Sequence, residues 1–120
     1  MNGRIGAILY VIWGLLHVIA AQKVYQLALS LEPGMVQGRM VQNAWNLLFF
    51  ALFSIVIAIF MNWRNTKVGY WLNLVVVSAA DIGFIVAILM PGHLPLIPGV
   101  IGPTIWLLAL AFTTIGILKG

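Results

Sequence analysis

Asp81 is the residue of this chain with the clearest capacity for chemistry, because it is the single charged residue in the apolar stretch 68–90. At about 1.5 Å rise per residue, a helix of this length crosses a hydrocarbon core of roughly 30 Å and carries Asp81 to within about 3 Å of the midplane. An ionised carboxylate at such a depth costs about 2.5–3.5 kcal/mol on insertion scales. Asp81 is therefore expected to be protonated, paired with another group or turned toward a polar cavity.

His17 is the second candidate, because it lies inside the first apolar run of the chain. An imidazole beside Asp81 could share its proton, and such a pair suits general acid–base chemistry on a lipophilic substrate, by isomerisation, hydration or ring opening. A carboxyl group that exchanges its proton for a cationic substrate would instead serve a proton-coupled exporter. In the purely structural alternative, a protonated Asp81 bonds to His17 or Asn46 and holds the helices in register.

Further polar and aromatic side chains are predicted to share the outer half of the membrane with this pair. Counted from the midpoints of their spans, His17 lies roughly 7 Å and Asn46 roughly 9 Å toward the outer side. Polar groups on spans turn inward because lipid cannot satisfy them, which predicts a polar pocket. The predicted ligand-binding residues are Asn46, Trp106, Asn43, Trp13, Tyr10, Phe84, Thr104 and His93.

A metal or haem site is the weaker alternative for the same residues. His17, His93 and Asp81 could supply two histidines and a carboxylate. Their spacing matches no helical metal-binding motif, and the chain contains no cysteine. We therefore expect neither a metal nor a cofactor.

The composition predicts an integral membrane protein. Of the 120 residues, 63% are hydrophobic and 7% are charged, whereas soluble domains carry about 25% charged residues. Six basic residues give a net charge of +4, but they lie at the ends of apolar runs and form no basic stripe. The lipid bilayer is therefore the expected surrounding, and nucleic acid is not an expected partner.

Four membrane-spanning helices are predicted, which makes the fold class an all-α bundle in a single domain, 1–120. The predicted spans are about 4–21, 44–61, 68–90 and 99–118, each near the ~20 residues that a bilayer requires. The first apolar run could pass for a signal peptide, but His17 inside it favours an uncleaved span.

The long link 22–43 keeps apolar residues at helical spacing, and its strongest helix breaker is Glu32-Pro33-Gly34. This pattern favours a helical hairpin that extends beyond the bilayer. The alternative is a segment that lies at the membrane interface.

The distribution of basic residues predicts the orientation. One side would carry Arg4, Arg64, Lys67 and Lys119, and the other Lys23 and Arg39. The positive-inside rule then places both termini in the cytoplasm, as expected for a protein of a bacterial inner membrane. Stripes of Gly and Ala along the spans could serve a homodimer.

In size and number of spans the chain is similar to the small multidrug-resistance exporters. That family carries its essential glutamate in the first span, whereas this chain has His17 there and its acid in the third, so no residue role is transferred. The sequence therefore predicts a site for a lipophilic small molecule, with acid–base chemistry by Asp81 and His17. Two alternatives stay open: an oligomeric proton-coupled exporter, and a non-catalytic accessory or assembly subunit of a membrane complex. Whether the protein is an enzyme is left undecided.

Overall fold

Residues 1–119, which the computed structural model describes, form helices joined by turns and contain no strand. The helices in chain order are α1 (Asn2–Leu29), α2 (Met35–Ile57), α3 (Lys67–Phe84), α4 (Leu96–Gly99) and α5 (Ile101–Lys119). Two π-helical segments, η1 (Ala58–Asn62) and η2 (Ile85–Leu89), continue α2 and α3 without a break. Four of the resulting helices are long and apolar enough to cross a membrane, which confirms the prediction of an all-α protein with four candidate spans.

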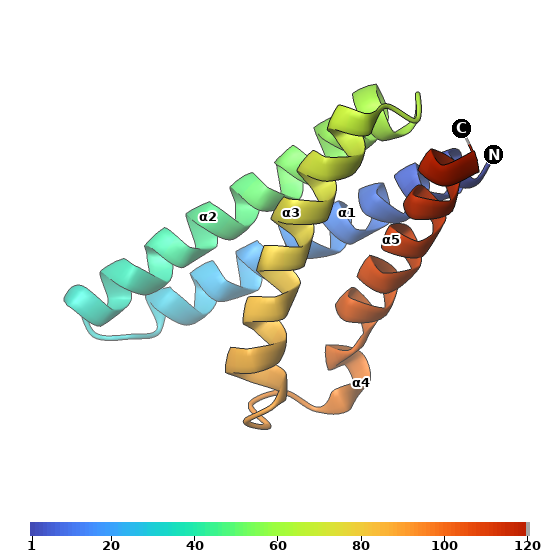
Figure 1. Ribbon diagram of the computed structural model, residues 1–120. Coiled ribbons are helices and arrows are strands. Elements are labelled where there is room, and N and C mark those ends of the chain that lie inside the picture. Colours follow the sequence, from blue (N-terminus) through green and yellow to red (C-terminus); the bar gives the residue numbers. More distant parts are fainter. Residues whose placement is uncertain (120) are drawn as a thin grey trace.

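The helices α1 and α2 lie side by side as an antiparallel hairpin, and both run well past the predicted span boundaries (Figure 1). The amide of Gln37 donates hydrogen bonds of 3.1 Å to the carbonyls of Ala28 and Leu31, which ties the start of α2 to the end of α1. Residues 22–43 are therefore mostly helical. Their position relative to a bilayer stays a prediction.

Small residues allow α1 to contact two neighbours closely. A Cβ on Gly14 would lie 2.8 Å from the carbonyl oxygen of Ala51 in α2. A Cβ on Gly6 would lie 2.9 Å from the backbone nitrogen of Thr113 in α5. These glycines of α1 are thus engaged inside the chain, where no side chain would fit.

The helix α3 crosses the α1–α2 hairpin steeply and diverges from it toward α4 (Figure 1). Its buried residues recur at every fourth position: Gly69, Asn73, Val77 and Asp81. The η2 segment that follows has no buried residue. Asp81 is therefore the last residue of this helix that packs into the interior.

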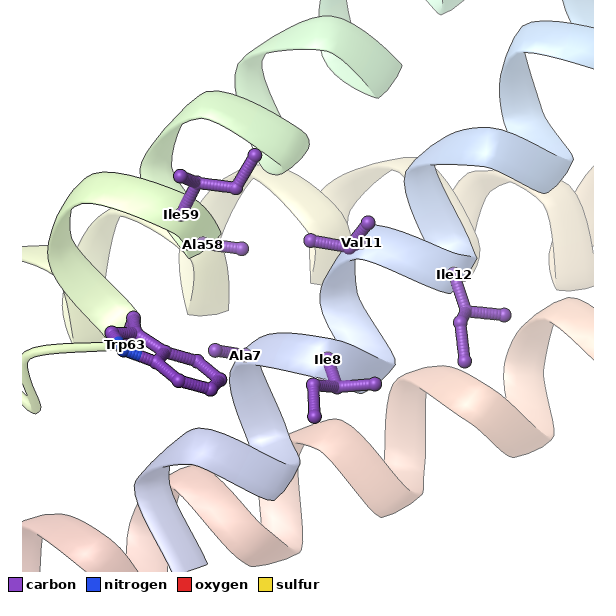
Figure 2. Close-up of a pocket in the computed structure, with 7 residues that line it drawn as sticks. All are labelled: Ala7, Ile8, Val11, Ile12, Ala58, Ile59 and Trp63. Atoms are coloured by element: carbon purple, nitrogen blue, oxygen red, sulfur yellow. The ribbon is translucent and has the colours of Figure 1, made fainter.

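Two apolar hollows lie on the surface away from Asp81. One lies between α1 and η1 and is closed at one end by Trp63 (Figure 2). The other runs along the outer face of α3, beside Trp71 and Val75.

Candidate functional site

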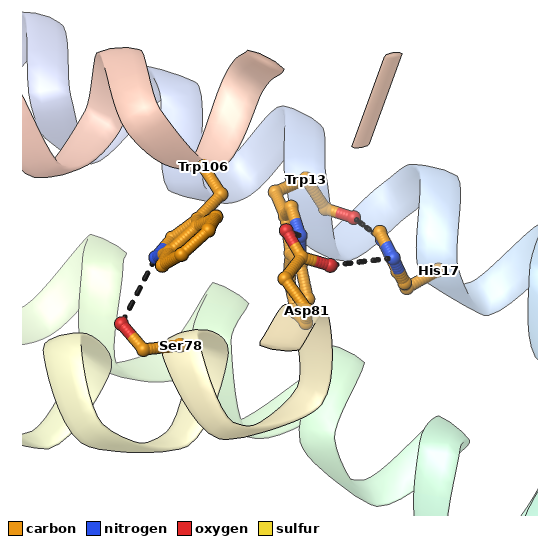
Figure 3. A network of polar contacts seen from close by, with 5 residues as sticks. All are labelled: Trp13, His17, Ser78, Asp81 and Trp106. Carbon is orange, nitrogen blue, oxygen red and sulfur yellow. Dashed lines mark hydrogen bonds and ion pairs between the residues drawn. The ribbon is translucent and has the colours of Figure 1, made fainter. Parts of the chain in front are cut away.

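Asp81 lies on α3, and two side chains of α1 face its carboxyl group (Figure 3). The indole Nε1–H of Trp13 donates a hydrogen bond of 3.0 Å to Oδ2. The Nε2 atom of His17 lies 3.6 Å from Oδ1. Asp81 and Trp13 have no exposed surface, while the side chain of His17 is 14% exposed. The fold therefore brings together the two residues that the sequence suggested as an acid–base pair.

The helical geometry of α1 positions both partners. Trp13 and His17 are one turn apart on the same face, and their rings stack with a centroid separation of 3.9 Å and an interplanar angle of 20°. The Nδ1 atom of His17 lies 2.7 Å from the carbonyl oxygen of Trp13. A carbonyl can only accept, so Nδ1 must carry a hydrogen. This contact fixes both the ring orientation and the tautomer.

The tautomer determines how many protons the pair can hold. With Nδ1 protonated, Nε2 presents a lone pair in the neutral ring and a hydrogen in the charged ring. Oδ1 of Asp81 has no hydrogen-bond partner among the described residues. One proton between Oδ1 and Nε2 would satisfy both atoms, as a neutral acid with a neutral imidazole or as a carboxylate with an imidazolium. Without that proton, a buried carboxylate would face a lone pair, which is strongly unfavourable. The pair is therefore a candidate to hold one proton.

His17 is the residue of the pair whose side chain keeps some exposed surface. Outward-facing residues follow Asp81 on α3 and η2, with Ile82 52% and Val86 58% exposed. The imidazole of His17 also lies close to α5. An added Cβ on Gly102 would lie 3.1 Å from Cε1 of His17. Because His17 keeps some exposed surface and Asp81 has none, the imidazole is the part of the pair that an outside molecule can contact.

Two further predicted residues, Trp106 and Tyr10, contact neighbours of the pair. The indole of Trp106 on α5 donates a hydrogen bond of 2.9 Å to the hydroxyl of Ser78 on α3, one turn before Asp81 (Figure 3). Tyr10 belongs with Trp13 to the buried hydrophobic cluster, and Trp106 packs against that cluster. The hydroxyl of Tyr10 is buried and has no hydrogen-bond partner among residues 1–119.

The other predicted ligand-binding residues lie elsewhere. Exposed positions are occupied by Asn43, Asn46, His93 and Thr104, and Phe84 is half-buried. The buried face of α2 is formed by Ala44, Ala51 and Ser54. Asn46 is two residues beyond Ala44, about 200° around the helix, so it points away from α1. The hydroxyl of Thr104 bonds to the Val100 carbonyl at 2.7 Å instead of reaching Asp81.

The sequence analysis did not identify Ser78 beside the site or the polar cluster around Asn73. Ser78 was not singled out, although a small polar residue three positions before Asp81 shares its helical face. The amide of Asn73 donates to Asn62 Oδ1 at 2.7 Å and to the Ser54 carbonyl at 3.1 Å. Asn73 therefore holds α3 against α2 and η1.

No group of three His, Asp or Glu side chains among residues 1–119 is arranged to hold a metal ion. Comparison with protein-family models, curated proteins and solved structures finds no match. Function must therefore be argued from the geometry around Asp81.

Proposed function

We propose that this chain is a multi-pass membrane protein whose Asp81–His17 pair binds a lipophilic small molecule and exchanges a proton with it. The observation that carries this proposal is the 3.6 Å approach of His17 Nε2 to the unpartnered Oδ1 of Asp81. A pair that holds one proton can donate it and recover it, which is the requirement for general acid–base catalysis.

Of isomerisation, hydration and ring opening, isomerisation fits this geometry best. The pair would add its proton at one atom of the substrate and take a proton from another atom, so that the proton count balances without a further reactant. Hydration would in addition consume a water molecule. Because Asp81 has no exposed surface, a substrate would exchange its proton with the pair through His17. The exposed aliphatic residues next to the site, Ile82 and Val86, favour a substrate that arrives from lipid.

The proposed location is a bacterial inner membrane with both termini in the cytoplasm. The start of α1, the end of α5 and the turn between η1 and α3 lie at one end of the molecule (Figure 1). This end carries Arg4, Arg64, Lys67 and Lys119, which supports the orientation through the positive-inside rule.

A proton-coupled exporter is the second candidate, because the same unpartnered Oδ1 could accept a cationic substrate once the proton has left. This candidate predicts efflux from proteoliposomes that depends on a pH gradient and requires Asp81. The isomerase predicts a chemical change in the lipophilic compound without any gradient.

The test compares the wild type with Asp81→Asn and with Glu32→Gln. Glu32 is the only other acidic residue and lies exposed in the α1–α2 turn, so its substitution is the matched control. Lipid-soluble metabolites of expressing cells, and compounds that copurify in mild detergent, would be compared by mass spectrometry. We expect a lipophilic compound to change in abundance with the wild type and Glu32→Gln, and to stay unchanged with Asp81→Asn. Equal profiles for all three proteins, together with copurification of a larger complex, would favour the accessory-subunit alternative and contradict the proposal.

A further inference from the structure

A long apolar groove separates α1 from η1 on the face shown in Figure 2. Its volume is about 310 Å³, and its lining residues are Ala7, Ile8, Val11, Ile12, Ala58, Ile59 and Trp63. The alanines form the floor, since Ala7 is 2% and Ala58 0% exposed. The surrounding isoleucines are about half exposed and form the walls.

The local sequence explains why the groove exists. Ala7 and Ala58 place single methyl groups where α1 and η1 face each other, so a hollow remains between the larger side chains. In η1 the backbone widens into a π-helix, a segment type that occurs frequently at functional sites. Trp63 follows directly after η1, and its ring closes the end of the groove.

A cation lies at that closed end. The guanidinium carbon of Arg4 is 4.9 Å from the centroid of the Trp63 ring, within cation–π range. The chain has two acidic residues. Glu32 lies in the turn at the opposite end of α1 and Asp81 is enclosed with His17, so neither neutralises this end. The groove therefore combines an apolar trough with a positive charge at the end that Trp63 closes.

We propose that this groove binds an anionic phospholipid, with an acyl chain along Ala7 and Ala58 and the phosphate beside Arg4. The apolar floor and walls match a hydrocarbon chain, and they offer no polar group that would recognise a more polar ligand. The guanidinium matches phosphate through charge-assisted hydrogen bonds. Arg64 and Lys67, which follow Trp63 closely in the chain, extend the same positive end.

This binding is independent of the chemistry proposed for Asp81, and it can be measured without any substrate. Purified, delipidated protein would be mixed with equal amounts of phosphatidylglycerol and phosphatidylcholine that carry the same acyl chains. Native mass spectrometry would then give the ratio of the two bound lipids. We expect the wild type to prefer phosphatidylglycerol.

Two matched pairs of variants locate the site. Arg4→Gln is compared with Lys23→Gln, an exposed basic residue near the other end of α1. We expect Arg4→Gln to lower the preference for phosphatidylglycerol about fivefold and Lys23→Gln to leave it unchanged. Trp63→Leu is compared with Trp45→Leu, since both tryptophans are exposed and Trp45 lines neither hollow. We expect Trp63→Leu alone to reduce the amount of bound phosphatidylglycerol.

The origin of the bound anion is tested by competition. An excess of inorganic phosphate should not displace phosphatidylglycerol if the acyl chain occupies the groove. Displacement by phosphate, equal retention of the two lipids by the wild type, or equal effects of Arg4→Gln and Lys23→Gln would each overturn the proposal.

Discussion

Trp13 and Asp81 are joined by a hydrogen bond of 3.0 Å between α1 and α3, in a place that water does not reach. One turn along α1, His17 faces the other carboxyl oxygen. The carboxyl group thus has a neutral donor at one oxygen and a titratable group near the other. The first contact is structural, and the second is the one proposed to exchange a proton.

Trp13→Phe should destabilise the fold, because Oδ2 of Asp81 loses its donor while the aromatic ring is kept. Loss of a partner from a buried polar group costs about 1–3 kcal/mol. The measurement is the free energy of unfolding in detergent, followed by circular dichroism. Trp45→Phe is the control, since Trp45 is 70% exposed on α2. Equal stabilities of the two variants would contradict the role assigned to the indole N–H.

Asp81→Asn and Asp81→Leu should differ in stability. Asparagine can accept from Trp13 and donate to Nε2 of His17, so the fold should lose less than about 1 kcal/mol. Leucine leaves the indole N–H buried without an acceptor and should cost about 1–3 kcal/mol. Thermal unfolding of both variants in the same detergent checks this order. Two variants of similar stability would show that the hydrogen bonds at this position contribute little.

Gly6→Ala should weaken the contact between α1 and α5. The added Cβ would lie 2.9 Å from the backbone nitrogen of Thr113, so a backbone must move, and overpacking of this kind costs about 1–3 kcal/mol. Gly38→Ala is the matched control, because a Cβ there meets nothing within 4 Å. Alanine also favours a helix interior over glycine by about 0.5–1 kcal/mol. Unfolding midpoints should therefore fall for the first variant and rise for the second.

Asn73→Leu should destabilise the junction of α2, η1 and α3. It removes the two hydrogen bonds that the Asn73 amide donates to Asn62 Oδ1 and to the Ser54 carbonyl. The buried oxygen of Asn62 then lacks this donor. The expected loss is about 1–3 kcal/mol. Asn43→Leu, at an exposed position of α2, should change the free energy of unfolding by less than about 0.5 kcal/mol. A loss of similar size in both variants would argue against a structural role of the Asn73 amide.

The sequence was sufficient to predict the helices and the central pair for a simple reason. Apolar runs of membrane length allow few structures, and a buried acid needs a polar partner at its own depth. Asp81 and His17 both lie in such apolar runs, and each can serve as the polar partner of the other. Depth alone could not predict which face of α2 turns inward, so Asn46 was assigned to the site although it is exposed.

The remaining differences arise from packing that leaves no local pattern. The π-helical segments η1 and η2 shift the helical phase, and no residue type in either segment predicts a π-helix. Ser78 joins the site only because α5 brings Trp106 within 2.9 Å of its hydroxyl. Contacts of this kind depend on how three helices meet, which the spacing within one helix does not specify.

The absence of buried residues in η2 has a mechanical consequence. Beyond Asp81, the arm formed by Ile82, Gly83, Phe84 and η2 contains exposed or half-buried residues only, so in the proposed bilayer it would contact acyl chains. A thinner or thicker membrane would therefore act on this arm first, at a cost of fractions of a kcal/mol per Å of mismatch. Any tilt of the arm would be centred on Asp81.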